Sequence, residues 1–90
     1  MADAARFQDE DRIRYVQSVF RRVLKLKQEA SPDDDFFALG GTSLTAIEVL
    51  DLIEAEQGTR LPVRNFYRST VIRELAGELA PDTAESAGGA

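Results

Sequence analysis

The chain has 90 residues, of which 43% are hydrophobic and 30% are charged, which predicts one small folded domain and argues against a disordered chain. Its 16 acidic and 11 basic side chains give a formal charge of −5, so nucleic acid is an unfavourable partner, because phosphate binding needs a cationic face. The absence of cysteine and histidine excludes disulfides, zinc-thiolate sites and the commonest general base, so we expect no catalytic residues of its own.

The first predicted element is an amphipathic helix over residues 9–28, which follows a flexible segment of residues 1–8. Its apolar residues recur at helical spacing and form one stripe that we expect to face the core. They are Ile13, Val16, Phe20, Val23 and Leu24. Acidic residues stand at its start and lysines near its end, where the helix dipole favours each.

Residues 29–42 form a long predicted connection between helices. Pro32 blocks continuation of the helix, and the aspartates that follow it can cap turns. A loop of this length is either functional or held by its own apolar residues. Phe36, Phe37 and Leu39 give the loop its own apolar anchors, and we expect Phe37 and Leu39 to pack onto the helices.

The second predicted helix runs from Ser43 to about Gln57, with Gly58 as its left-handed stop. Its predicted buried face consists of Ala46, Val49, Leu50 and Ile53. Leu44 and Ile47 lie off the centre of this face. They belong either to the edge of the core or to a surface that contacts other proteins.

A short helical turn and a last helix complete the predicted fold. Pro62 suits the first position of a turn that carries Val63 and Phe66. Ser69 or Thr70 can cap the last helix, which ends before Pro81 and is followed by a disordered tail of residues 81–90. The apolar face of the last helix consists of Ile72, Leu75, Ala76 and Leu79. With no strand pattern, the sequence predicts an all-α bundle of three main helices plus one short helix.

Ser43 stands two residues after a pair of glycines at the predicted start of the second helix, and its position allows three interpretations. As an N-cap it would accept a hydrogen bond from the first turn. A nucleophilic role is disfavoured, because the chain has no histidine, no S-x-x-K and no G-x-S-x-G motif. A phosphodiester on its hydroxyl would be stabilised by the free N–H groups of a helix N-terminus, which glycines allow a ligand to approach closely. The residues alone leave the first and third interpretations open.

The stretch DDDFFALGGTSLTAIEVLDLIEAEQG resembles the phosphopantetheine attachment region of carrier proteins, specifically the peptidyl carrier (thiolation) domains of non-ribosomal peptide synthesis. The resemblance extends over about residues 10–80 and includes the F-F-x-L-G-G-x-S-L core, LPVRNFY and TVIRELA. It implies an acyl-carrier-protein-like bundle in which Ser43 carries a 4′-phosphopantetheine arm. A phosphopantetheinyl transferase would attach this arm from coenzyme A, and its thiol would hold an aminoacyl or peptidyl group as a thioester. A borrowed thiol accounts for the missing cysteine.

The resemblance also implies partners: an adenylation enzyme that loads the arm, and downstream tailoring or condensation enzymes. Leu44, Ile47 and the short helix near Phe66 would contact them. Thr42 stands where fatty-acid and polyketide carriers usually have aspartate, which favours the peptidyl branch. The second helix is acidic, as in acyl carriers, so an acyl cargo is the alternative hypothesis. A third hypothesis is an unmodified helical adaptor that binds protein through the Leu44–Ile47 edge.

Several expectations concern the protein as a whole. The chain starts at a methionine and contains nothing besides this domain, so we expect a free-standing, monomeric carrier whose folded part is residues 9–80. No apolar run is long enough to span a membrane and the N-terminus lacks a signal-peptide core, so we expect a cytoplasmic protein without a membrane partner. Asp33 to Asp35 do not fit a calcium loop, because Leu44 stands where an EF-hand counted from Asp33 needs glutamate.

Overall fold

The computed structural model describes residues 2–79, and for residues 2–9 it describes the backbone alone. The helices are α1 (Ala2–Leu24), α2 (Ser43–Gln57), α3 (Val63–Arg68) and α4 (Ile72–Glu78). Within residues 2–79 there is no β-strand, only an isolated antiparallel bridge between Asp35 and Val71. The predicted all-α class is therefore confirmed. No helix in this part of the chain has both the length and the apolar character needed to cross a bilayer.

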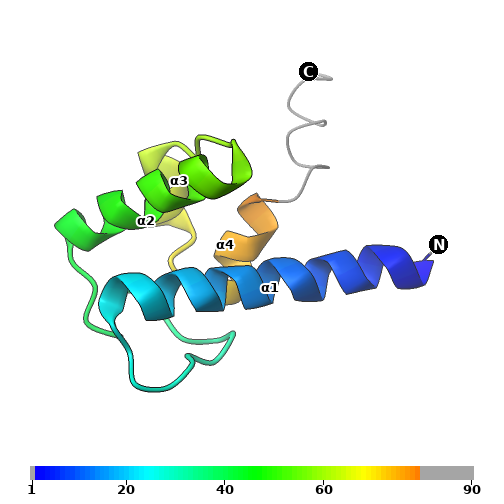
Figure 1. Ribbon diagram of the computed structural model, residues 1–90, viewed down its shortest axis with the longest axis horizontal. Helices are drawn as coiled ribbons and strands as arrows, with labels where there is room; N and C mark the ends of the chain where they lie inside the picture. Colours follow the sequence, from blue (N-terminus) through cyan, green and yellow to red (C-terminus); the bar gives the residue numbers. More distant parts are fainter. Residues whose placement is uncertain (1, 80–90) are drawn as a thin grey trace.

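The long helix α1 is the element on which the others assemble (Figure 1). It packs against both α2 and α4. Figure 1 shows the chain leaving α1, passing through the long loop and returning to the start of α2. The first residue of α2 therefore lies at one end of the bundle, directly after this loop.

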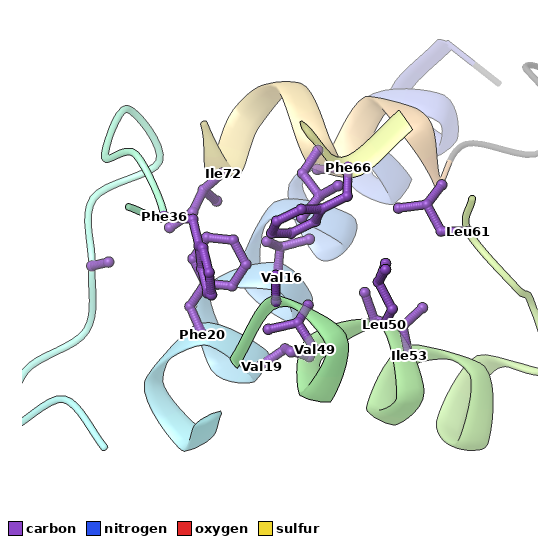
Figure 2. Packing of buried hydrophobic residues seen from close by; sticks show 14 residues of the cluster. Val16, Val19, Phe20, Phe36, Val49, Leu50, Ile53, Leu61, Phe66 and Ile72 are labelled. Carbon is purple, nitrogen blue, oxygen red and sulfur yellow. The ribbon is translucent and has the colours of Figure 1, made fainter. Parts of the chain in front are cut away.

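A single apolar core lies between the helices (Figure 2). It consists of Val16, Val19, Phe20, Ala30, Phe36, Ala46, Val49, Leu50, Ile53, Leu61, Phe66, Ile72, Leu75 and Ala76. The predicted faces of α2 and α4 are confirmed, with Leu79 partly buried against the core. In α1 the periodic stripe omitted Val19, which is fully buried, whereas Ile13, Val23 and Leu24 are only partly buried.

The bounds of α1 differ from the prediction. The helix begins at Ala2, well before residue 9, so no break in the helical backbone marks the predicted start of the domain. It ends at Leu24 because Lys25 adopts a left-handed conformation with φ of 56°, which a continuous right-handed helix does not allow. The predicted disordered tail, residues 81–90, lies outside the described residues.

The long loop is held to the rest of the fold by its own apolar residues, as expected. Phe36 is fully buried, whereas Phe37 remains 37% exposed and packs on α3, where its ring stacks on Tyr67. The ring of Phe36 meets those of Phe20 and Phe66 edge to face, with centroids 4.9 and 5.2 Å apart. Leu39 packs partly buried against the core, as predicted.

The caps of the two short helices also differ in detail from the prediction. Pro62 is the N-cap of α3 rather than its first residue. Neither Ser69 nor Thr70 caps α4, whose N-cap is Val71 with no side-chain hydrogen bond. The hydroxyls of Ser69 and Thr70 instead donate to Glu78 and Asp35, so tertiary partners take the groups that local capping would use.

Candidate functional site

Ser43 is the first residue of α2 and its side chain is exposed. The N-cap is its neighbour Thr42, whose Oγ1 accepts a hydrogen bond from the Thr45 backbone N–H at 3.2 Å. Thr45 Oγ1 accepts in return from the Thr42 N–H at 2.7 Å, which completes a capping box. The interpretation of Ser43 as the helix cap is therefore wrong, and its hydroxyl is left free of that role.

The first turn of α2 leaves polar groups available beside Ser43. The Thr45 N–H is taken by the cap and the Ala46 N–H donates to the Thr42 carbonyl. Among the described residues, the N–H groups of Ser43 and Leu44 have no acceptor. These N–H groups carry the partial positive charge of the helix N-terminus, which stabilises a nearby anion.

The two glycines before the helix serve different purposes. Gly40 has φ of +103°, a conformation that side-chain-bearing residues rarely adopt. At Gly41 the reason is space, because a Cβ there would lie 2.3 Å from the ring of buried Phe36. Gly41 therefore lets the backbone pass directly over the Phe36 ring, and this contact fixes where α2 begins.

Asp35 fixes the loop that leads to Ser43. Its Oδ2 accepts from the N–H groups of Phe37 and Ala38, at 2.9 and 3.1 Å, and its Oδ1 accepts from the Thr70 hydroxyl. The Thr70 hydrogen bond, followed by the backbone N–H bonds, lowers the pKa of Asp35 below its ordinary value. The Phe36 N–H also donates to the Thr70 carbonyl at 2.9 Å. The approach to α2 is therefore tied to the connection between α3 and α4.

Tyr67 of α3 reaches the site, a contact that the sequence analysis did not predict. Its hydroxyl donates to Ser43 Oγ over 3.3 Å, which is longer than the usual O–H···O distance of about 2.7–2.8 Å and therefore weak. The Tyr67 ring stacks on Phe37, with centroids 5.7 Å apart and planes 9° from parallel. It also meets Phe66 edge to face at 5.8 Å. An exposed aromatic pair therefore stands beside the Ser43 hydroxyl.

Several apolar side chains of α2, α3 and the loop are exposed to solvent. Leu44 is 71% exposed and Ile47 is 38% exposed, so Leu44 is not part of the core and Ile47 is at most at its edge. From α3, Val63 and Tyr67 are exposed, whereas Phe66 is fully buried and forms part of the core instead of a contact surface. We call the exposed set Leu44, Ile47, Val63, Tyr67 and Phe37 the apolar rim.

Three of the four acidic residues of α2 are paired with arginines of this chain. Arg60 binds Asp51 and Glu54 at 3.1 and 2.9 Å. Glu56 accepts hydrogen bonds from Arg22 and from the Tyr15 hydroxyl, each at 2.8 Å. These bonds lower the pKa of Glu56, while burial and the Glu56 carboxylate raise the pKa of Tyr15 to about 12.

Comparison with known protein families identifies the family of the chain. Residues 14–79 match the family model described as "Phosphopantetheine attachment site". The chain belongs to this family of phosphopantetheine-dependent carrier domains. The predicted family and its cofactor, 4′-phosphopantetheine bound covalently, are thereby confirmed. The match extends over most of the described helices, from the middle of α1 to the end of α4.

Related segments occur in nonribosomal peptide synthetases. The chain is 39% identical over 72 residues to the nonribosomal peptide synthetase tcpP of Claviceps purpurea, which covers 78% of the chain and 4% of tcpP. It is 33% identical over 70 residues to the indigoidine synthase of Streptomyces lavendulae, covering 78% of the chain and 5% of that enzyme. The isonitrile lipopeptide synthase of Mycobacterium tuberculosis is 39% identical over 67 residues, 74% of the chain and 3% of the synthase. The chain thus spans only a small fraction of each of these relatives.

A solved structure confirms the fold. BlmI, described as a type-II acyl-carrier-protein from Streptomyces verticillus involved in bleomycin biosynthesis, superposes with a TM-score of 0.81. The superposition covers 88% of this chain and 94% of BlmI at 20% sequence identity. The predicted acyl-carrier-protein-like bundle is therefore confirmed. Carriers of this family act with the enzymes of a synthesis pathway rather than alone.

The residues around Ser43 fit a phosphopantetheine arm. The hydroxyl is exposed, so a second protein can reach it. The N–H groups of Ser43 and Leu44 are available to an anionic phosphate, and the two glycines keep the preceding backbone free of side chains. When bound, the arm supplies a thiol that can form a thioester, a group that the chain itself lacks.

Proposed function

We propose that Ser43 is the attachment point and that the chain is a free-standing aminoacyl or peptidyl carrier. The observation that carries the proposal is the position of Ser43: an exposed hydroxyl at the first residue of α2, relieved of capping by Thr42. In the modification, Ser43 Oγ forms a bond to the phosphorus that bears the pantetheine of coenzyme A. The bond from that phosphorus to the second phosphate breaks, adenosine 3′,5′-bisphosphate leaves, and the hydroxyl proton passes to a base of the phosphopantetheinyl transferase.

The side chains around Ser43 indicate which protein supplies the catalytic base. The described surroundings of Ser43 offer one phenol and no carboxylate, amine or imidazole in hydrogen-bond contact with its hydroxyl, so the transferase supplies the base. In this proposal an adenylation enzyme loads the arm, and tailoring or condensation enzymes act on the bound group. The chain itself positions the arm and performs no catalysis.

The partner surface in this proposal is the apolar rim. Its members lie on α2, on α3 and in the loop, and Tyr67 contacts Ser43 directly, so we expect a partner that reaches Ser43 to contact the rim as well. On α2, Asp51, Glu54 and Glu56 are already bound by arginines of this chain. These bridges engage three of the four carboxylates of α2 and leave Glu48 exposed, so in this proposal the apolar rim supplies the transient contacts and the remaining acidic charge can assist a cationic partner.

An acyl cargo is the second candidate, favoured by the likeness in fold to BlmI, a type-II acyl-carrier-protein. That likeness also supports a separate carrier rather than a module joined to an enzyme. We propose a cytoplasmic monomer, for which light scattering should give a mass independent of concentration. Loading assays with candidate activating enzymes separate the cargoes: amino acids on the arm support the peptidyl carrier, and fatty acids alone support the acyl carrier.

The modification is tested with coenzyme A, magnesium and a broad-specificity transferase, followed by intact mass measurement. Wild type should gain the mass of one phosphopantetheine group. Ser43→Ala should gain nothing, while the matched control Ser18→Ala, altered at a serine of α1, should gain the same mass as wild type. No gain by wild type would leave the unmodified helical adaptor as the better account.

A further inference from the structure

The contact between α3 and the attachment residue carries a further inference, which rests on the proposed function of Ser43. Tyr67 is the only described side chain outside α2 that hydrogen-bonds to Ser43, and it does so through its hydroxyl. We propose that Tyr67 is a positioning residue for the arm: its hydroxyl binds the phosphate once the arm is attached to Ser43, and so holds the base of the arm against α3.

Two ring contacts hold the Tyr67 side chain in place before Ser43 is modified. It stacks on Phe37 and meets Phe66 edge to face, so rotation of the ring away from Ser43 would give up both contacts. Aromatic pairs of this kind contribute about 0.5–1.5 kcal/mol beyond the area they bury. Phe37 is in turn held by its edge-to-face contact with buried Phe36, at 5.2 Å. This series of rings directs the Tyr67 hydroxyl toward Ser43.

The strength of the hydrogen bond should rise on modification. In the unmodified chain Tyr67 donates to a neutral hydroxyl over 3.3 Å, which is a weak bond. A phosphodiester on the same oxygen brings negatively charged acceptors to the place where the phenol already points. Hydrogen bonds to ionised acceptors are shorter and about twice as strong as those between neutral groups. Tyr67 therefore favours the modified state, in which its donor has the better partner.

The position of Tyr67 gives this contact a consequence for partner binding. Tyr67 is 44% exposed and belongs to the apolar rim, so a docked enzyme covers it. A partner that moves Tyr67 breaks the hydrogen bond and frees the base of the arm. Release of the arm would then be coupled to docking through one side chain.

The proposal is tested by phosphorus NMR on the modified protein. Wild type, Tyr67→Phe and the matched control Tyr15→Phe are each converted with coenzyme A and the transferase, and intact mass confirms the modification. Tyr15 is the chain's other tyrosine and contacts Glu56, away from Ser43. We expect the phosphodiester resonance of Tyr67→Phe to be displaced from that of wild type, and the resonance of Tyr15→Phe to coincide with wild type.

The outcomes separate this inference from the proposed function. Coinciding phosphorus resonances for wild type and folded Tyr67→Phe, both modified at Ser43, would overturn the role of Tyr67 and leave the attachment site intact. Failure of modification at Ser43 would overturn the proposed function itself. Should Tyr67→Phe not fold by circular dichroism, Phe37→Leu decides instead: it removes the stacking partner and should displace the same resonance, whereas an unchanged resonance contradicts the proposal.

Discussion

The C-terminal half of α2 is joined to α1 by side chains, whereas its N-terminal end is fixed by a capping box within its own first turn and by the loop that precedes it. At the C-terminal half, Glu56 binds Arg22 and Tyr15 of α1, and Gly58 closes the helix with φ of 72°. At the other end, the Thr42 cap and the backbone above Phe36 fix the start of the helix. Because these contacts use neither the Ser43 nor the Leu44 side chain, both side chains stay exposed at the start of the helix.

The largest effect should come from removing the ring beneath the loop. Phe36→Ala should lower the free energy of unfolding by about 3–5 kcal/mol, because it opens a cavity under Gly41 and between Phe20 and Phe66. Domains of this size have total stabilities of only about 5–15 kcal/mol. Urea unfolding measures the loss. Phe37→Ala is the matched control and should lose less, because Phe37 is 37% exposed; an equal loss there would contradict Phe36 as the principal anchor of the loop.

Two leucines of α2 compare a core position with the apolar rim. Leu50 is fully buried, so Leu50→Ala should cost about 2–5 kcal/mol of unfolding free energy. Leu44 is 71% exposed, so Leu44→Ala should change it by no more than about 0.5 kcal/mol. Leu44→Ala should instead raise the KM of a loading enzyme for the carrier. A large loss of stability in Leu44→Ala would place this residue in the core.

Gly41→Ala tests the close passage of the backbone over the core. The added Cβ would lie 2.3 Å from the Phe36 ring, so either the ring or the start of α2 must move. Overpacking of this kind costs about 1–3 kcal/mol. Chemical denaturation gives the cost, and NMR shifts around Thr42 and Ser43 report the movement. A variant as stable as wild type, with unchanged shifts, would contradict the proposed fit.

Thr42→Ala removes the cap of α2. Loss of an N-cap hydroxyl costs about 0.5–2 kcal/mol of unfolding free energy, and here the contact between the Thr42 and Thr45 hydroxyls is lost as well. Ser43→Ala should leave stability close to that of wild type, because its hydroxyl has no capping role. Thermal denaturation of both variants makes the comparison. Equal losses of unfolding free energy in the two variants would contradict the assignment of the cap to Thr42 alone.

The smallest effect concerns the hydrogen bond between Tyr15 of α1 and Glu56 of α2 at alkaline pH. The pKa of Tyr15 is raised from 10.0 to about 12, so the folded protein binds the phenol proton more tightly than the unfolded chain does. This contribution is fully present below pH 10 and is lost as the pH rises toward 12. Wild type should therefore lose more stability than Tyr15→Phe between pH 9 and about 11.5 in denaturant titrations. If the unfolding free energies of the two proteins fall in parallel with pH, the Tyr15–Glu56 hydrogen bond contributes nothing to stability.

The periodic parts of the fold were predictable from sequence. The buried face of α2 follows from the spacing of Ala46, Val49, Leu50 and Ile53 alone. The loop was less predictable, because Phe36 and Phe37 are adjacent aromatic residues with no periodicity to distinguish them. Their different burial is decided by the tertiary fold, through the Phe36–Thr70 backbone bond and the space left by Gly41.

The site also has features that the sequence predicted and features that it did not. The sequence pointed to Ser43 through its glycines, its place at a helix start and a family motif. It did not indicate whether Thr42 or Ser43 caps the helix, since either residue type is suitable. It gave no sign of Tyr67, because the contact with Ser43 joins two helices and depends on how α3 packs. Hydroxyl pairs of this kind have no spacing rule along the chain.

Fragmentation mass spectrometry of the modified protein tests the central claim most directly. Three neighbouring hydroxyls, those of Thr42, Ser43 and Thr45, lie at the start of α2, and two of them are bound to each other in the capping box. The account predicts that every modified chain carries phosphopantetheine on Ser43. Modification of Thr42 or Thr45, or no modification by a transferase that converts a reference carrier in the same mixture, would contradict it.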